Sequence, residues 1–222
     1  MVALIGDPRA GMWSGTFDNL GYLMHFKVVH IYKAGCPAPL ANYVPSGEPE
    51  GSTWVACNEF HKGMIHALDV LKPKVIVIAS ETLLDLANPP HNAEATPAQT
   101  QADLEKLIKA LPSASKAVVL SGFPTPGYST EPTMCLSKAP RSPSDCNFTP
   151  SPVVTASNQA FENAASQTGA GYIDEGPWFC ASVCPPIIAS TIVYTIDGWH
   201  SDGWYLNYLT RALWAALKPY LG

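Results

Sequence analysis

The clearest catalytic chemistry in the sequence comes from two residues near its end, where Asp197 stands three positions before His200. A carboxylate at this spacing can orient an imidazole and stabilise its charged form, so that the imidazole acts as a general base. The pair stands just ahead of a predicted C-terminal helix, for which Ser201 is the expected N-cap. Because the same spacing also occurs in turns that only cap a helix, the pair needs support from other residues.

The turn after the first apolar run is a second candidate site. Val2–Gly6 has the length and composition of a buried strand, and Asp7, Pro8 and Arg9 lead from it into a predicted helix. A strand, a sharp turn and a helix resemble a nucleophile elbow, at which backbone N–H groups stabilise a developing oxyanion. The structural alternatives are that Asp7 caps the helix, that Pro8 suits its first turn, and that Arg9 faces solvent or pairs with an acid. The functional alternative for Arg9 is contact with an anion or a sugar.

Alternating β-rich runs and helical patterns predict the elements that position these residues. Strands are predicted at Val2–Gly6, Phe26–Tyr32, Val75–Ala79, Lys116–Gly122 and Tyr172–Asp174, and a small extra strand or hairpin at Ile187–Tyr194. Helices are predicted near residues 11–22, 60–71, 104–111, 154–168 and 206–217. We therefore expect a three-layer α/β/α sandwich with a mostly parallel five-stranded sheet and flavodoxin-like winding. In such a sheet the site gathers at the carboxyl ends of the strands.

Length and composition fit one domain over residues 1–222. Hydrophobic residues make up 47% of the chain, which is enough for a sizeable core. The 21 prolines and 16 glycines indicate long loops, above all a Pro- and Ser-rich insertion at 123–151. The net charge is −5, and no basic cluster is present, which argues against nucleic acid as a partner. No stretch reaches the roughly 18 apolar residues of a transmembrane helix.

The six cysteines form three close-set pairs in loop-like sequence, which indicates disulfides and hence a compartment outside the cytosol. Sequence spacing alone does not decide how they pair. A zinc site is the alternative, but the sequence has no CxxC pair and no histidine close to the cysteines in a ligand pattern. His61 and His66 are five positions apart, which does not place both on one metal-facing stripe of a helix. The cysteines are Cys36, Cys57, Cys135, Cys146, Cys180 and Cys184.

Taken in order, the motifs resemble the SGNH (GDSL-like) hydrolases. In particular, the chain is similar to the extracytoplasmic C-terminal domain of membrane-bound acyltransferases of the acyltransferase-3 family, which open with Gly-Asp-Ser-His-Ala. The matching segments cover essentially the whole chain: Gly6–Ala10, Gly35–Pro37, Trp178–Cys180, Cys184–Pro185, Val193–Tyr194 and Asp197–His200. The resemblance implies a disulfide within each neighbouring cysteine pair. It also implies that Asp197 orients His200 and that the Gly35 N–H helps to hold the oxyanion.

The chain departs from this family at the position that matters most. Pro8 stands where the family has its nucleophilic serine, and Arg9 stands where it commonly has histidine. Proline has neither a nucleophilic atom nor an N–H, so one substitution removes the nucleophile and one oxyanion donor. The family's third-motif asparagine is not evident after the third strand. Asn88 and Asn92 could reach the site only if their loop folds back, and the nearest other hydroxyls, those of Ser14 and Ser201, are not at the elbow.

The resemblance implies an extracytoplasmic domain, periplasmic or on the outer face of the cytoplasmic membrane, of a membrane-bound acyltransferase. We expect it to take part in the O-acylation, chiefly O-acetylation, of envelope glycans or glycolipids with a degenerate nucleophile position. Its partners would be the acceptor, an acyl donor and a tethering transmembrane part outside these residues, with no cofactor and no metal. One alternative is an active esterase or acyltransferase that uses Asp197 and His200 without the serine. The other is a non-catalytic module that binds a glycan or a partner.

Overall fold

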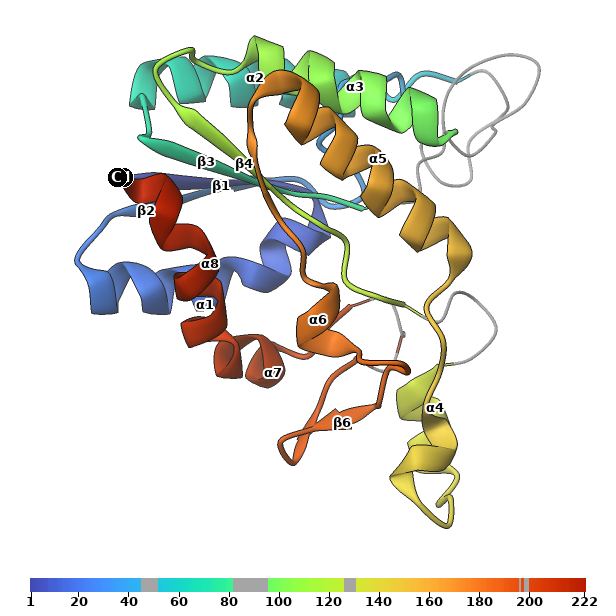
Figure 1. Ribbon diagram of the computed structural model, residues 1–222. Coiled ribbons are helices and arrows are strands. Elements are labelled where there is room, and N and C mark those ends of the chain that lie inside the picture. Colours follow the sequence, from blue (N-terminus) through green and yellow to red (C-terminus); the bar gives the residue numbers. More distant parts are fainter. Residues whose placement is uncertain (45–51, 82–95, 126–130, 196, 198–199) are drawn as a thin grey trace.

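The computed structural model describes residues 1–44, 52–81, 96–125, 131–195, 197 and 200–222 (Figure 1). Its centre is a sheet of five parallel strands in the order β2-β1-β3-β4-β5. The strands are β1 (Val2–Gly6), β2 (Val28–Tyr32), β3 (Val75–Ala79), β4 (Lys116–Leu120) and β5 (Gly171–Ile173). This order is that of a flavodoxin-like sheet, as the sequence predicts.

Helices cover both faces of the sheet (Figure 1). One side carries α2 (Val55–Leu71), α3 (Pro97–Ala110) and α5 (Pro152–Thr168), and the other carries α1 (Pro8–Met24), α7 (Gly203–Tyr208) and α8 (Thr210–Leu221). In β1, Val2 and Leu4 belong to the core that includes α1 and α8, whereas Ala3 and Ile5 belong to the core that includes α2 and α5. Since successive side chains of a strand point to opposite faces, one continuous apolar run fills both cores and produces three layers.

The first helix begins three residues earlier than its apolar pattern suggests. Pro8 takes the first helical position, where a missing N–H costs nothing, and Asp7 is the N-cap. The carboxylate of Asp7 accepts a hydrogen bond from the Arg9 N–H at 2.8 Å. The structural roles predicted for Asp7 and Pro8 are therefore both realised, and they place the strand-to-helix turn at the carboxyl end of β1, between β2 and β3 in the sheet.

The predicted last helix is divided, and its predicted cap is wrong. α7 ends at Tyr208 and α8 begins at Thr210. The N-cap of α7 is Asp202, whose carboxylate accepts from the Trp204 N–H at 2.8 Å. The Ser201 hydroxyl instead donates to the carbonyl of Val193 at 2.8 Å. A tertiary contact thus takes the side chain that helix-capping rules assigned to the helix.

The insertion at 123–151 carries two short helices, α4 (Pro132–Ser137) and the 3₁₀ helix η1 (Pro143–Cys146). After β5 come α6 (Gly176–Phe179) and a hairpin of β6 (Ile187–Ile188) with β7 (Thr191–Ile192), which confirms the small extra hairpin. Backbone hydrogen bonds between Phe148 and Cys184 join the end of the insertion to the segment after α6. Within the described part of the chain, no helix has both the length and the apolar character needed to cross a membrane.

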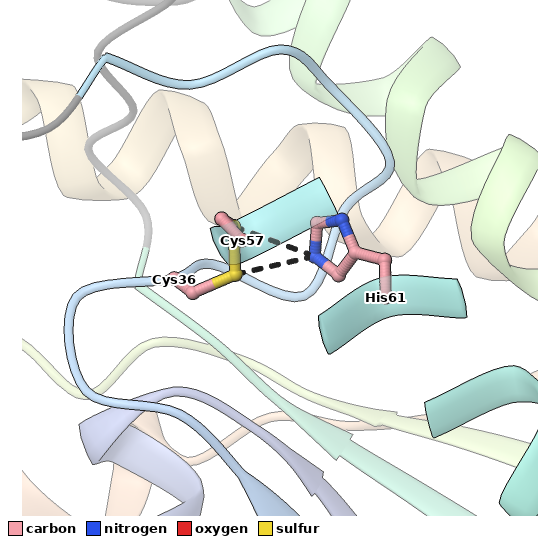
Figure 2. Close-up of side chains that lie close together, drawn as sticks. All are labelled: Cys36, Cys57 and His61. Carbon is pink, nitrogen blue, oxygen red and sulfur yellow. Dashed lines mark hydrogen bonds between the residues drawn. A yellow bond between two sulfur atoms is a disulfide. The ribbon is translucent and has the colours of Figure 1, made fainter. Parts of the chain in front are cut away.

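All three neighbouring cysteine pairs form disulfides: Cys36–Cys57, Cys135–Cys146 and Cys180–Cys184. The reasoning that no histidine lies near the cysteines was wrong. The Nε2 atom of His61, one turn after Cys57 in α2, lies 3.6 Å from the Cys36 sulfur and 4.0 Å from the Cys57 sulfur (Figure 2). The same nitrogen lies 2.8 Å from the carbonyl oxygen of Pro37. Burial lowers the pKa of His61, so a neutral imidazole and a disulfide together fix the loop that follows β2.

Candidate active site

The turn between β1 and α1 requires glycine at its start. Gly6 has a φ of 148°, and a Cβ atom there would lie 1.8 Å from the carbonyl oxygen of Ala79. Gly6 pairs with Ala79 in the parallel ladder between β1 and β3. The close approach of these two strand ends brings the residues after Gly6 next to the residues after Ala79, at the edge of the sheet where the family motifs predict a site.

At this edge of the sheet, the carboxylate of Asp7 accepts hydrogen bonds from several neighbouring segments. Its side chain is buried and accepts hydrogen bonds from the Arg9 N–H at 2.8 Å, the Ser80 hydroxyl at 3.0 Å and the Glu81 N–H at 2.6 Å. The Ser80 hydroxyl also accepts from the Ala38 N–H at 2.9 Å. Burial, helped by the nearby Glu81 carboxylate, raises the pKa of Asp7 to about 6. The carboxylate thus connects the ends of β1 and β3 with the loop after β2.

Arg9 is turned inward, which corrects the solvent-facing alternative and agrees with the alternative that it pairs with an acid. Only 4% of the residue is exposed. Its guanidinium donates to both carboxylate oxygens of Glu81, at 3.2 and 3.3 Å, and lies 4.0 Å from the centre of the Phe123 ring. A bidentate pair above an aromatic face suits a guanidinium well. Arg9 therefore forms part of the wall beside position 8.

Glu175 is a buried acid in the same region that the sequence analysis missed. It is 2% exposed, and its carboxylate accepts from the indole N–H of Trp13 at 3.1 Å. Burial raises its pKa to about 8, against the opposing effect of the Arg9 charge. Among the described residues, Nη1 of Arg9, Oε2 of Glu175 and the Tyr194 hydroxyl are buried without a hydrogen-bond partner. The position of Glu175 directly after the predicted fifth strand was the signal that could have found it.

His200 and Asp197 form the predicted pair. The imidazole Nδ1 lies 2.7 Å from Oδ2 of Asp197, and the His200 backbone N–H donates to Oδ1 at 3.0 Å. The Thr195 hydroxyl donates to the same Oδ1 at 2.6 Å, a contact that the sequence gave no reason to expect. This geometry places a proton on Nδ1 and leaves Nε2 as a proton acceptor. The side chains are 39% and 46% exposed, so the imidazole is open to a ligand.

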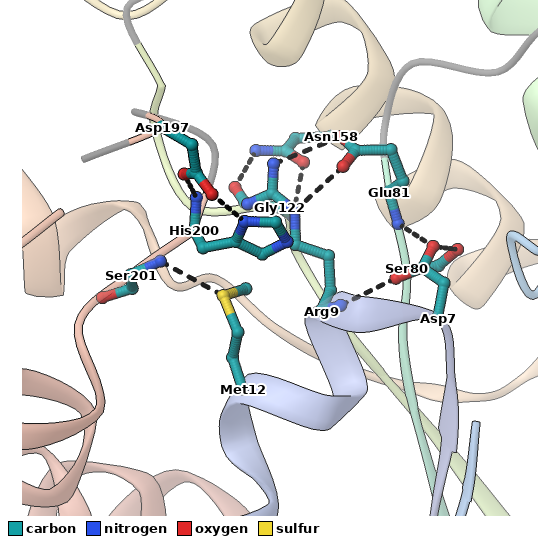
Figure 3. Close-up of polar contacts among 10 residues, drawn as sticks. All are labelled: Asp7, Arg9, Met12, Ser80, Glu81, Gly122, Asn158, Asp197, His200 and Ser201. Carbon is teal, nitrogen blue, oxygen red and sulfur yellow. Dashed lines mark hydrogen bonds and ion pairs between the residues drawn. The ribbon is translucent and has the colours of Figure 1, made fainter. Parts of the chain in front are cut away.

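One contact brings this pair to the first turns of α1. The backbone N–H of Ser201 lies 3.1 Å from the sulfur of Met12, one helical turn beyond Pro8. Figure 3 shows this contact and the pair of His200 with Asp197. The contact places the segment that carries His200 beside α1, the helix that Pro8 begins.

Gly35 adopts a φ of 68°, and a Cβ atom there would lie 3.2 Å from the Trp54 ring. Its N–H makes no hydrogen bond with any residue that the structure describes. Of the alternative hydroxyls, that of Ser14 donates to the Gly11 carbonyl at 2.6 Å, and that of Ser201 is held by Val193 as above. Among the described residues, neither hydroxyl makes a hydrogen bond with the His200 side chain. Asn88 and Asn92 lie outside the described residues.

The family follows from comparison with known proteins. Residues 1–200 match the family model described as "SGNH domain (fused to AT3 domains)". The chain belongs to this family. No curated protein matches the sequence significantly. The family model therefore identifies this SGNH domain, whereas the description of its site rests on the geometry given above.

Solved structures share the fold of this SGNH domain. The periplasmic domain of the lipopolysaccharide acetyltransferase of Salmonella ser. Paratyphi A aligns with a TM-score of 0.70 at 13% identity, over 98% of this chain and 82% of that one. A putative acylhydrolase from Bacteroides fragilis aligns at 0.60 and 13%, over 100% and 88%. The C-terminal catalytic domain of the Streptococcus pneumoniae peptidoglycan O-acetyltransferase A aligns at 0.52 and 14%, over 99% and 93%. At these identities the likeness concerns the fold alone.

This SGNH domain has an oriented base but no nucleophile at residue 8. A histidine oriented by a carboxylate is present and exposed. At position 8, where the family's serine would stand, the ring of proline offers no nucleophile and no N–H. The arrangement can accept a proton from a bound hydroxyl, but it cannot form an ester on residue 8.

Proposed function

We propose that this SGNH domain works outside the cytoplasm as part of a membrane-bound acyltransferase that O-acetylates envelope glycans or glycolipids. The family's fusion to AT3 domains supports a membrane part that supplies the acyl group. The fold neighbours support the acceptor class, because one is a lipopolysaccharide acetyltransferase domain and another is a peptidoglycan O-acetyltransferase domain. The three disulfides support an oxidising compartment.

The observation that carries this proposal is the 2.7 Å contact between Asp197 and Nδ1 of His200. Nε2 of His200 accepts the proton of an acceptor hydroxyl, and Asp197 stabilises the imidazolium that forms. The hydroxyl oxygen forms a bond to the acyl carbon of the donor, and the bond between that carbon and its carrier breaks, leaving the carrier with the electron pair. The carrier then takes the proton from His200. No covalent intermediate on residue 8 is needed.

The absence of a nucleophilic atom and an N–H at Pro8 supports a second candidate, a module that binds the glycan without catalysing transfer. In this case the membrane part carries out the transfer, and the SGNH domain only presents the acceptor. The two candidates differ in whether His200 contributes to turnover.

Hydrolysis and transfer with an activated acetyl ester test the proposal. The purified domain is given 4-nitrophenyl acetate with and without an acceptor oligosaccharide, and His200→Ala is compared with His66→Ala, a change at an exposed histidine of α2. We expect His200→Ala to lower turnover by about 10²- to 10⁴-fold, the usual contribution of a general base, and His66→Ala to leave it unchanged. Equal turnover in the domain and in His200→Ala would exclude His200 as the base and favour the binding module.

A further inference from the structure

A hollow of the molecule lies beside the candidate site. It has a volume of about 600 Å³ and lies between α5 and the segments that follow β4 and β5. We call it the α5 groove and define it by Thr155, Gln159 and Glu162 of α5, Tyr172 of β5, and Asp174. Its volume falls within the range of small-ligand sites.

The α5 groove and the site share their walls. Phe123 lies under the guanidinium of Arg9, whereas the next residue, Pro124, lines the groove. Likewise Glu175 is buried in the region of Arg9, whereas Asp174 lines the groove. After β4 and after β5, one residue thus lies against the candidate site and the next or preceding residue lines the groove.

Asn158 fixes this shared wall. Its side-chain amide donates to the Gly122 carbonyl and accepts from the Gly122 N–H, both at 2.7 Å (Figure 3). Asn158 itself lines the α5 groove, and Gly122 directly precedes the Phe123 ring that supports Arg9. A ligand seated in the groove therefore lies against the same backbone that shapes the site.

The polar groups of the groove suit hydroxyl groups. Thr155, Gln159 and Glu162 follow one another at helical spacing and form an exposed stripe along α5. Gln159 donates to Oε2 of Glu162 at 3.1 Å, which holds an amide and a carboxylate together. Asp174 accepts from the Gly176 N–H at 2.9 Å and is exposed. Amide, hydroxyl and carboxylate groups next to a tyrosine ring offer both donors and acceptors, as a sugar requires.

The negative charge of the groove disfavours an anionic sugar as its ligand. Glu162 and Asp174 are its charged residues, and none of the described residues that line it is lysine, arginine or histidine. An anionic sugar would meet two carboxylates and no cation. We propose that the α5 groove binds the acceptor glycan through an uncharged or amine-bearing sugar. This inference rests on the proposed function for its acceptor class.

Binding of three trisaccharides by isothermal titration calorimetry tests the groove. The probes are the trisaccharides of N-acetylglucosamine, of glucosamine and of galacturonic acid. We expect the neutral or the amine-bearing probe to bind and the anionic probe not to bind. The combined change Gln159→Ala and Glu162→Gln should weaken binding by about tenfold, the effect of losing one or two hydrogen bonds. The control Gln99→Ala lies in a separate hollow between α2 and α3 and should bind as the unchanged domain does.

Charge reversal provides the decisive variant. Glu162→Lys should weaken binding of the glucosamine trisaccharide and allow the galacturonic acid trisaccharide to bind. The proposal is overturned if none of the probes binds, if the anionic probe binds best to the unchanged domain, or if the groove variants bind as Gln99→Ala does. The binding measurement contains no acyl donor, so it can fail while ester turnover still depends on His200, and it can succeed when turnover does not.

Discussion

The amino end of α1 and the segment around His200 meet at the same edge of the sheet, but they are built in different ways. Asp7 and Arg9 are 1% and 4% exposed, and hydrogen bonds and an ion pair hold them to the ends of the neighbouring strands. His200 and Asp197 have side chains 39% and 46% exposed, and they are oriented mainly by each other and by Thr195.

This difference in exposure indicates which role each of the two regions has. On the α1 side, the residues that surround position 8 stabilise the fold, and a proline is well accommodated there. On the other side, the imidazole keeps a free proton acceptor in an open position. An oriented base beside a helix that begins with proline is consistent with direct attack by an acceptor hydroxyl. The following changes break or sharpen this comparison.

Restoring the serine should have the largest effect. In Pro8→Ser the first helical residue regains a hydroxyl and an N–H, and His200 can activate the hydroxyl. We expect hydrolysis of 4-nitrophenyl acetate to rise by about 10²-fold or more, the contribution of general base catalysis to such an attack. The matched control is Pro8→Ala, which regains only the N–H. Equal rates in the two variants would mean that His200 cannot reach position 8.

Removing the buried cation should destabilise the fold. In Arg9→Ala the carboxylate of Glu81 loses its ion pair with Arg9, and the buried acids Asp7 and Glu175 lose a nearby positive charge. Because breaking a buried ion pair is costly, we expect the free energy of unfolding to fall by about 3 kcal/mol. Urea unfolding measures the change. Arg141→Ala, at an exposed arginine, is the control and should stay within about 0.5 kcal/mol. A similarly small change in Arg9→Ala would show that Arg9 is not structural.

The buried acid Glu175 should make stability depend on pH. Its pKa rises from 4.5 to about 8 on folding, so the folded state binds the proton more tightly and stability is lost as the pH rises from about 5 through 8. Glu175→Gln stays neutral and keeps an oxygen for the Trp13 N–H. We expect it to lose less stability than the unchanged domain between pH 5 and pH 9, by about 2–4 kcal/mol.

Thermal unfolding across this pH range measures the Glu175 effect. Asp7, whose pKa rises to about 6, contributes a loss of the same sign at lower pH in both proteins. Glu59→Gln changes an exposed glutamate paired with Lys62 and should follow the unchanged domain. Parallel pH profiles for Glu175→Gln and the unchanged domain would mean that Glu175 is not buried as an acid.

The smallest effect is expected at Thr195, which positions Asp197 without touching a ligand. Thr195→Val removes the 2.6 Å hydrogen bond to Oδ1 but keeps the shape of the side chain. We expect ester turnover to fall by about five- to tenfold, because a typical hydrogen bond contributes about 1 kcal/mol, while stability changes by less than about 1 kcal/mol. Thr195→Ser, which keeps the hydroxyl, should recover turnover. If it does not, the hydroxyl has no positioning role.

Much of the fold could be read from the order of apolar runs. The runs at Val2–Gly6 and Val75–Ala79 became buried parallel strands with those bounds. The helix ends were less predictable, because they depend on single contacts. Ser201 has the right chemistry for a cap, but its hydroxyl is bound by Val193, and Asp202 caps the helix instead. The capping preference of a serine is not realised when its hydroxyl makes a hydrogen bond outside the helix.

The sequence by itself determined the covalent chemistry of the site: proline at position 8 has no nucleophile, and Asp197 stands at the spacing that can orient His200. Only the tertiary structure decided that Arg9 pairs with Glu81, a residue 72 positions away. The reason is the register of the parallel ladder, in which Gly6 lies opposite Ala79, so that the residues following each strand end meet. Local sequence fixes spacing along the chain, whereas neighbours across a sheet exist only once strands have paired.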